Sequence, residues 1–359
     1  MEGTRDIAAS LEVLLARAVA RRAAWIPALE ATGTDAYRLF HGVSEGWPGL
    51  TIDRYGPLVL AQTFREPLES AQIATLAAFA RSGAIGTQLF VYNHRSDPRQ
   101  GGNAPFARWH EPAPEALAEL VCREHGVQFE IRARHRGRDP WLFLDLRDGR
   151  RRLCELAPGK SVLNLFAYTC GAGIAAAKAG ASEVWNVDFA SSALDVGRRN
   201  AARNGVDSVG NDGDGGRVRF LAEDCLPVLR QLAGFAVKGR GAAHAHAQVE
   251  RRRFDIVFLD PPAWSKGPFG AVDVERDYES LFKPALACTQ PGGWIIATNH
   301  SANVELGAWL LSLERCARKS GGAIEIVETL GPGPDFPSLD GRAPLKIAVC
   351  AVVGIASAR

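Results

Sequence analysis

The sequence has 359 residues, of which 47% are hydrophobic and 23% are charged, and this balance fits a globular protein with a core, in one large or two ordinary domains. The formal net charge of +2 excludes a strongly basic chain, so any basic surface that binds nucleic acid must be local. The longest apolar run, residues 347–358, is too short to span a bilayer, so no membrane-spanning helix is expected.

The seven cysteines are scattered and include no Cys-x-x-Cys pair. Their odd number and their spacings fit no zinc pattern, so we expect free thiols, a reducing cytoplasmic location and no metal site. The first residues carry several charges and no uninterrupted apolar core, and no signal peptide is expected.

The first part of the chain predicts a small mixed domain behind a helical start. Residues 7–31 are rich in Ala, Leu and Arg at helical spacing. From Tyr37, short β-type runs alternate with Gly/Pro turns, then residues 68–81 look helical and residues 88–93 form another β-type run. The expected divisions are a helical N-terminal segment over 1–35, a small α/β accessory domain over 36–110 and a connecting segment over 111–160.

From residue 161 onward, apolar runs of strand length alternate with helical stretches. The runs cover residues 161–167, 183–189, 218–223, 254–260, 293–299, 323–330 and 345–353. This alternation predicts a Rossmann-like, doubly wound, seven-stranded parallel sheet over residues 161–359. The Gly/Ala-rich tract over 234–253 lacks a core pattern, and we expect it to be a mobile insertion.

The stretch VLNLFAYTCGAG, residues 162–173, predicts a strand, a loop and the start of a helix. Gly171 and Gly173 allow a ligand to approach the backbone closely, and a helix start favours an anionic group. Four residues, AYTC, separate the strand from the first glycine, whereas a dinucleotide-binding loop has its glycine almost directly after the strand. The longer loop suits an amino-acid moiety.

Acidic residues end the next two strands. Asp188 can accept hydrogen bonds from both hydroxyls of a ribose, and Asp224 can accept one from an adenine amine. Either acid alone fits a helix cap equally well. Signals on three successive strands together favour a nucleotide site.

The stretch FDIVFLDPPAWSK, residues 254–266, ends a hydrophobic strand on an acid and two prolines. The first and fourth strands of a doubly wound sheet are neighbours at its switch point, so Asp260 emerges beside the nucleotide loop. Pro261 and Pro262 fix the turn. Asp260 adds an acceptor, and Trp264 adds a flat face for stacking. These features predict a seat for a planar, amine-bearing substrate; the alternative is that the prolines only end the strand and Trp264 packs in the core.

In these motifs the chain resembles the bacterial ribosomal-RNA large-subunit methyltransferases of the class I, S-adenosylmethionine-dependent type, the group that contains the 23S rRNA 5-methylcytosine and N7-methylguanine enzymes. The resemblance covers roughly residues 35 to 353, and its segments are DAYRLFHGVSEGWPGLTIDRYG (35–56), WLFLDLRDGRR (141–151), VLNLFAYTCGAG (162–173), VWNVDFASSALDVGRRNAARNG (184–205), FDIVFLDPPAWSK (254–266) and DVERDY (273–278). It implies an S-adenosylmethionine-dependent methyltransferase domain with S-adenosylmethionine as the cofactor. That group often begins with a small β-rich RNA-binding domain, whereas the first 35 residues here look helical.

The resemblance also implies roles for particular residues. The implied cofactor-binding residues are Phe143, Asp145, Arg147, Asn164, Phe166, Ala167, Thr169, Gly171, Gly173, Asp188, Phe189, Asp224, Cys225 and Asp260. Those implied at the methyl transfer are Asp260, Pro261, Pro262, Trp264 and Asn299.

Cysteines are missing from the two places where 5-methylcytosine enzymes keep their nucleophile. Ala263 occupies one of them, and Asn299, His300 and Ser301 occupy the other. Carbon 5 of cytosine needs covalent activation by a thiolate, whereas a ring nitrogen with a lone pair needs only alignment with the methyl group. This chemistry agrees with the resemblance, which is closest to the N7-methylguanine branch: that branch likewise has DPP, then an aromatic residue, and an asparagine after the fifth strand.

The substrate class rests on weaker signals. Residues 132–152 hold eight arginines against three aspartates, which suits either a polynucleotide clamp or a solvated charged face. His300 follows the fifth strand and fits either a substrate contact or a structural role, whereas His244 and His246 fit chance composition better than a metal site. We expect a methyltransferase that acts on a base nitrogen of ribosomal RNA; the alternatives are a small-molecule N- or O-methyltransferase and a non-catalytic RNA-binding factor with a vestigial cofactor site. The sequence does not indicate the oligomeric state.

Overall fold

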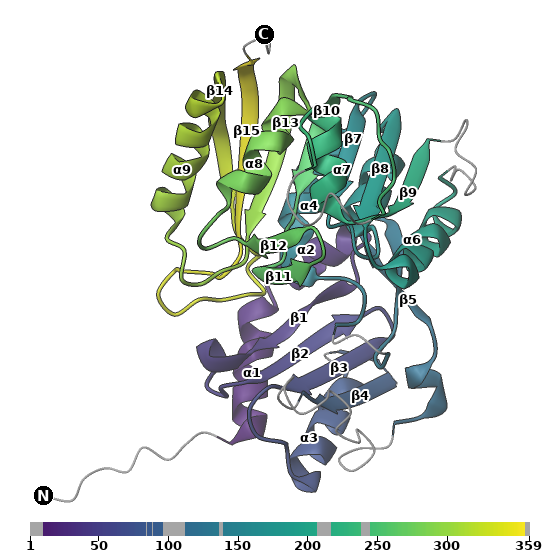
Figure 1. Ribbon diagram of the computed structural model, residues 1–359. Helices are drawn as coiled ribbons and strands as arrows, with labels where there is room; N and C mark the ends of the chain where they lie inside the picture. Colours follow the sequence, from purple (N-terminus) through teal and green to yellow (C-terminus); the bar gives the residue numbers. More distant parts are fainter. Residues whose placement is uncertain are drawn as a thin grey trace, which may run out of the picture. The chain divides into compact units, whose positions relative to one another are not determined.

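The computed structural model of the protein describes residues 10–83, 85–87, 89–95, 112–135, 139–206, 217–237 and 245–355. The chain divides into two compact units, both drawn in Figure 1. Unit 1 comprises Met1–Leu144 and Pro334–Gly341, and unit 2 comprises Asp145–Gly333 and Arg342–Arg359. Over the described residues, no helix is long and apolar enough to cross a membrane.

Unit 1 is built around a four-stranded sheet with the order β1-β2-β3-β4. Its strands are β1 (Ala36–His41), β2 (Leu50–Tyr55), β3 (Leu58–Thr63) and β4 (Leu89–His94). The first three strands are antiparallel neighbours, whereas β3 and β4 run parallel. Parallel neighbours need a crossover, and helix α3 (Ser70–Arg81) supplies it. The helix expected over 68–81 and the strand expected over 88–93 are therefore confirmed.

The helical start is confirmed and shares the core of unit 1. Helices α1 (Leu11–Arg22) and α2 (Ile26–Ala31) precede β1. One face of α1 joins a hydrophobic cluster with residues of the sheet and of α3. The α1 residues in this cluster are Leu11, Leu14, Leu15 and Ala18. Because of this common cluster, the structure groups the expected segment 1–35 with the small domain; residues 1–9 lie outside the described part.

The segment expected to connect the two domains, residues 111–160, is divided between the units. Its elements are the short 3-10 helix η4 (Pro114–Leu117), strands β5 (Leu120–Glu124) and β6 (Val127–Ile131), the 3-10 turn η5 (Leu144–Leu146) and helix α4 (Arg147–Leu156). The β5–β6 hairpin belongs to unit 1, where the Asp35 N–H donates to the backbone oxygen of Arg123 and the Arg123 N–H donates to Oδ1 of Asp35. Helix α4 belongs to unit 2. The boundary follows Leu144.

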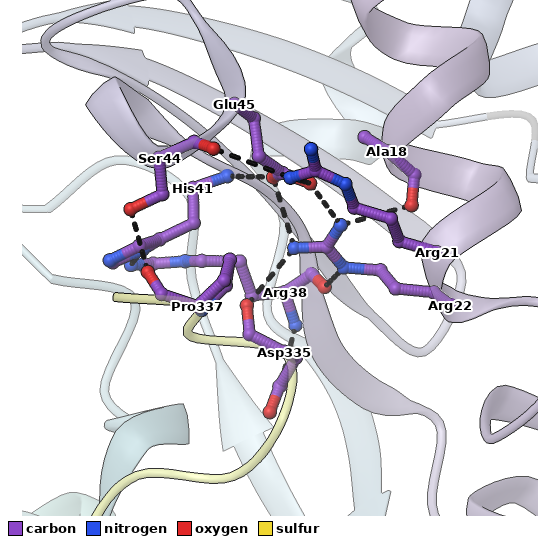
Figure 2. A network of polar contacts seen from close by, with 9 residues as sticks. All are labelled: Ala18, Arg21, Arg22, Arg38, His41, Ser44, Glu45, Asp335 and Pro337. Carbon is purple, nitrogen blue, oxygen red and sulfur yellow. Dashed lines mark hydrogen bonds and ion pairs between the residues drawn. The ribbon is translucent and has the colours of Figure 1, made fainter. Parts of the chain in front are cut away.

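A loop from late in the chain completes unit 1. The sequence predicts residues 334–341 within the C-terminal domain, but the structure groups them with unit 1. Figure 2 shows the reason: the buried Asp335 accepts from Nη2 of Arg22 at its backbone oxygen (3.1 Å) and from the backbone N–H of Arg38 at Oδ2 (3.0 Å). Arg22 also forms a buried ion pair with Glu45, with Nη1 and Oε1 2.6 Å apart.

Unit 2 holds a seven-stranded sheet with the order β14-β15-β13-β10-β7-β8-β9 (Figure 1). Its strands are β7 (Ser161–Leu165), β8 (Glu183–Asp188), β9 (Val218–Ala222), β10 (Phe254–Leu259), β13 (Thr289–Asn299), β14 (Gly322–Leu330) and β15 (Lys346–Ile355). All seven expected strands are present, which confirms the Rossmann-like, doubly wound sheet. The expectation of a wholly parallel sheet is wrong, because β15 runs antiparallel to β13 and β14. No helix separates β14 from β15, and neighbouring strands joined without a crossover pair antiparallel.

Helices pack in two rows against this sheet. The helices are α4, already described, α5 (Gly171–Lys178), α6 (Ser191–Arg203), α7 (Cys225–Leu232), α8 (Glu279–Ala287) and α9 (Leu306–Lys319). Helix α5 contacts α4 and α6, whereas α8 contacts α7 and α9. Strand β7 lies between β8 and β10, so the strand order reverses at β7 and creates the switch point where ligands bind in such sheets.

The tract over 234–253, expected to be a mobile insertion, is bonded to α7 in its last part. Gln231 of α7 donates from Nε2 to the backbone oxygen of Ala247 (3.0 Å) and accepts from the backbone N–H of Val249 (3.1 Å). The Val249 side chain packs against the core of unit 2. These contacts anchor residues 247–249 to unit 2, and the expected mobility of the tract stays a prediction. Residues 238–244 lie outside the described residues.

Candidate active site

Three neighbouring strands of unit 2 end at one level of the sheet. The paired residues at these ends are Leu259 of β10, Leu165 of β7 and Val187 of β8. The residues that follow them, Asp260, Phe166 and Asp188, therefore leave the same edge of the sheet together. This register brings the predicted nucleotide loop beside the predicted substrate seat.

The loop after β7 has an unusual backbone. Phe166, Tyr168 and Cys170 have φ angles of 57°, 49° and 63°, in the left-handed region that non-glycine residues avoid. Neighbouring strand ends hold this conformation, because the Phe166 N–H donates to Sγ of Cys225 (3.1 Å) and the Tyr168 N–H donates to Oδ2 of Asp188 (2.8 Å). Strain that is held in this way is typical of a ligand-binding loop.

Close packing explains the second glycine of the loop. A Cβ on Gly173 would lie 1.9 Å from Oδ1 of Asn186. The same oxygen accepts a hydrogen bond from Nδ2 of Asn164 (2.8 Å), and both asparagines are buried. Glycine at 173 therefore lets α5 approach the strands. The implied contacts with the methionine part of the cofactor stay predictions for Asn164, Phe166, Ala167, Thr169, Gly171 and Gly173.

Asp188 keeps acceptor capacity for a ligand. Its Oδ2 accepts from the Tyr168 N–H, its Oδ1 accepts from the Ala190 N–H (2.9 Å), and its exposed fraction is 8%. Burial raises the pKa of this carboxyl above its ordinary value, and the two N–H donors oppose that shift. Each carboxylate oxygen can accept a further hydrogen bond, so the pair fits the two hydroxyls of a ribose. The next residue, Phe189, is 73% exposed and offers an aromatic face.

Asp224 caps helix α7, as the simpler interpretation of this residue expects. Its Oδ1 accepts from the Leu226 N–H at 2.8 Å. Burial raises the pKa of its carboxyl, with smaller contributions from the negative charges of Asp188 and Glu223. A Cβ on Gly267 would lie 3.0 Å from Oδ2, so the hairpin that carries Gly267 lies beside this acid.

Two donors converge on one oxygen of Asp260. The hydroxyl of Thr298 and Nε2 of His300 (2.7 Å) both donate to Oδ1. Among the residues that the structure describes, none donates to Oδ2, which leaves that oxygen to accept from a ligand. The pairing of Leu259 with Ala297 places Asp260 and Thr298 side by side at the ends of β10 and β13.

The residues after Asp260 form an exposed hairpin of β11 (Trp264–Gly267) and β12 (Gly270–Asp273). Pro261 is buried and Pro262 is exposed. Trp264 is 64% exposed, so the alternative that it packs in the core is wrong. Its indole is available for stacking.

Asn299 turns into the protein. It is fully buried, donates from Nδ2 to the Val274 oxygen (3.3 Å) and accepts at Oδ1 from the Ser301 N–H (2.9 Å). Both halves of its amide hold the loop after β13, and its implied part at the methyl transfer stays a prediction.

The implied residues Phe143, Asp145 and Arg147 fall in different units. Phe143 belongs to unit 1 and is 46% exposed, whereas Asp145 and the buried Arg147 belong to unit 2. Their part in cofactor binding stays a prediction.

The arginines of the segment 132–152 do not form one free basic face. Arg147 and Arg150 are buried, and Arg151 and Arg152 bond to Glu155 in the same helix. Burial keeps Arg147 and Arg150 from the surface, and Glu155 pairs with the other two, so the expected polynucleotide clamp stays a prediction for this segment. Residues 136–138 lie outside the described part. Over the described residues, no cluster of His, Cys, Asp and Glu side chains is arranged to hold a metal ion.

Comparison with known proteins identifies the protein family of this chain. The sequence model of the S-adenosylmethionine-dependent methyltransferases matches residues 37–351, and the chain belongs to this family. It is thus an enzyme that transfers a methyl group from S-adenosylmethionine.

Curated relatives and solved structures agree with this family. The chain is 29% identical to ribosomal RNA large subunit methyltransferase I of Aeromonas salmonicida over 315 residues, which cover 87% of this chain and 72% of that protein. It is 31% identical to a ribosomal RNA large subunit methyltransferase of Deinococcus radiodurans over 308 residues, 85% of this chain and 69% of that protein. The fold is similar to that of SMU.776 in complex with SAH, with a TM-score of 0.75 and 22% identity, over 97% of this chain and 83% of that one.

The residues present fit this cofactor. Asp188 has acceptor capacity left on both oxygens, the next residue, Phe189, is exposed, and the loop after β7, which bonds to Asp188, has a strained backbone. The roles expected for Asp188 on the ribose, for Asp224 on the adenine and for Phe189 in cofactor binding stay predictions.

Replacing Asp188 with alanine should weaken S-adenosylmethionine binding by about 1.5–3 kcal/mol, the scale of lost hydrogen bonds to a charged group. Titration calorimetry measures this change, and Asp195→Ala, which removes an exposed carboxylate from α6, should leave the affinity unchanged. Since the carboxylate is the acceptor and burial raises its pKa, wild-type affinity should begin to fall at a higher pH on acidification than an ordinary aspartate would produce. Wild-type affinity in a folded Asp188→Ala variant would contradict the assignment.

Proposed function

We propose that this methyltransferase modifies ribosomal RNA of the large subunit at a ring nitrogen of a base, N7 of guanine. The curated relatives with 29% and 31% identity carry the name of ribosomal RNA large subunit methyltransferases, which supports RNA as the substrate class. A cytoplasmic location goes with such a substrate, and it is consistent with seven described cysteines of which none is in a disulfide.

The observation that carries the proposal is the pair Asp260 and Trp264 at the switch point. Oδ2 of Asp260 can accept from the N–H groups of a guanine, and the exposed indole can stack on the flat face of a base. Both groups follow β10, whose end is level with the cofactor loop of β7. The base is thereby oriented beside the methyl donor, and orientation can supply much of the rate enhancement.

The cysteines near the site favour nitrogen over carbon. Burial raises the pKa of the Cys170 and Cys225 thiols well above the ordinary value, so neither is a thiolate at neutral pH. Cys225 moreover uses its sulfur to hold the Phe166 N–H. S-adenosylmethionine, when bound, supplies a methyl group activated by its sulfonium. The lone pair of a ring nitrogen can accept that group without a thiolate or a general base.

The direct experiment treats unmodified ribosomal RNA with the purified protein and S-adenosylmethionine, then measures modified nucleosides by mass spectrometry. We expect 7-methylguanosine. Formation of 5-methylcytidine, or covalent trapping of the enzyme by RNA that contains 5-fluorocytosine, would overturn the nitrogen assignment. Methylation of small molecules alone would overturn the RNA assignment.

Trp264→Ala should weaken RNA binding by about 1–3 kcal/mol, the range for a lost stacking partner, while S-adenosylmethionine binding stays unchanged. Filter binding at fixed salt measures the first quantity, and calorimetry measures the second. Leu311→Ala is the matched control, since Leu311 on α9 is also 64% exposed and should leave RNA binding unchanged. Equal RNA affinities in all three proteins would rule out stacking on Trp264.

A further inference from the structure

The loop after β13 places a histidine against the acid of the proposed substrate site. Nε2 of His300 lies 2.7 Å from Oδ1 of Asp260, and the Thr298 hydroxyl donates to the same oxygen. We propose that His300 is a positioning residue, which holds Asp260 by Oδ1 so that Oδ2 faces the N–H groups of the base. This inference rests on the proposed function, because it assigns the orientation of the same site.

The histidine is held by a loop with several anchors. The hydroxyl of Ser301 donates to Glu275, and its backbone oxygen accepts from Nζ of Lys346 (2.6 Å). Nδ2 of Asn303 also donates to Glu275 (3.0 Å). Asn299, on the other side of His300, is held by its bonds to Val274 and Ser301. The loop thus holds the backbone on both sides of the histidine, and a carboxylate bonded by a fixed donor is preorganised for its ligand.

The charges around His300 favour its protonated form. Asp260 of the β10 end and Asp145 of the turn before α4 face it with negative charge, and Lys346 of β15 faces it with positive charge. Burial alone would lower the pKa of His300, but the two carboxylates, Asp260 foremost, raise it above the ordinary value. A protonated imidazole gives Asp260 a charge-assisted hydrogen bond, which is stronger than the bond from a neutral ring.

This arrangement predicts a pH dependence with a definite sign. Because the pKa of His300 is raised, its imidazole is charged below that pKa and loses this charge as the pH rises through it. Oδ1 of Asp260 is then held by the Thr298 hydroxyl and by the weaker hydrogen bond of the neutral His300 ring. The turnover number should therefore fall on the alkaline side of the profile, while cofactor binding through Asp188 stays constant there.

Three variants test the proposal in the full chain with whichever RNA the enzyme accepts. His300→Leu removes the donor and should lower kcat about 10- to 100-fold with unchanged S-adenosylmethionine affinity. His300→Gln keeps an N–H donor without a charge, so it should restore most of kcat near neutral pH and abolish the alkaline decline. Asp255→Asn, at the opposite end of β10, should keep the wild-type pH profile. Wild-type kcat in His300→Leu, or an unchanged alkaline decline in His300→Gln, would overturn the proposal.

A titration without substrate separates this inference from the proposed function. NMR of the imidazole in the wild-type chain should give His300 a pKa above 6.5, the ordinary value. Asp260→Asn should lower that pKa, since it removes the charge that raises it. A wild-type pKa of His300 at or below 6.5 would overturn the pairing of His300 with Asp260, even if the enzyme methylates guanine. A raised pKa together with methylation of a different base would support the pairing and refute only guanine as the substrate base.

Discussion

Replacing Arg22 with methionine should lower the free energy of unfolding of the protein by about 3–5 kcal/mol, the usual cost of leaving one partner of a buried ion pair unpaired. The guanidinium of Arg22 is almost fully buried, and all five of its N–H groups donate. Two of them reach the buried carboxylate of Glu45, and the other three reach the backbone oxygens of Ala18, Arg38 and Asp335 (Figure 2). Methionine fills similar space but satisfies none of these acceptors.

Chemical denaturation followed by circular dichroism measures the loss. Arg21→Met is the matched control, because Arg21 directly precedes Arg22 in α1 and is mostly exposed. Its replacement should lower the free energy of unfolding by about 0.5 kcal/mol or less. The double variant Arg22→Met, Glu45→Met removes both charges and should be more stable than Arg22→Met alone. A cost below about 1 kcal/mol for Arg22→Met would show that this network does not hold unit 1 together.

The strands of unit 2 could be predicted because each is a short apolar run. In Phe254–Leu259 all residues except Asp255 are buried, as expected for a strand covered on both faces. The direction of β15 could not be predicted, since apolar character says nothing about orientation. It follows from the absence of a helix between β14 and β15, because neighbouring strands joined without a crossover pair antiparallel.

The grouping of residues 334–341 with unit 1 had no signal in the sequence. It depends on Asp335 meeting Arg22 and Arg38, which lie 313 and 297 positions away along the chain. A single sequence shows that these residues are charged, but it does not show which charge is paired with which. The same limit applies to the basic segment 132–152, because its sequence does not show that Arg151 and Arg152 bond to Glu155.

The acids of the site were predictable and their partners were not. Strand ends at one edge of a parallel sheet converge, and this rule alone brings Asp188 and Asp260 to the site. The use of one Asp260 oxygen by Thr298 and His300 depends on the register of β10 and β13. The inward turn of Asn299 likewise depends on its bond to Val274, since the sequence of a loop does not reveal side-chain direction.

Replacing Asp260 with asparagine should lower kcat/KM about 100- to 1000-fold, the scale of losing one preorganised group at a reacting centre. Asparagine keeps the shape of the side chain but has only one oxygen. The donors of Thr298 and His300 both point at the Oδ1 position, so the amide oxygen should take that place. The amide NH2 then occupies the position of Oδ2, so that its hydrogens face the N–H groups of the base. Two donors that face each other leave both groups unsatisfied, which costs more than the loss of one hydrogen bond.

Steady-state kinetics on the methylated RNA measures this loss, and calorimetry checks that S-adenosylmethionine still binds. The matched control is Asp255→Asn, the same change at the opposite end of β10, where the carboxylate accepts from the N–H (2.8 Å) and hydroxyl (2.7 Å) of Ser161. This control should reduce stability without changing kcat/KM, because Asp255 lies at the amino end of the strand, away from the switch point. If Asp260→Asn and Asp255→Asn had equal kcat/KM values, the acceptor at Oδ2 would have no part in orienting the base. A selective loss in Asp260→Asn would instead tie the reaction to the carboxylate that ends β10.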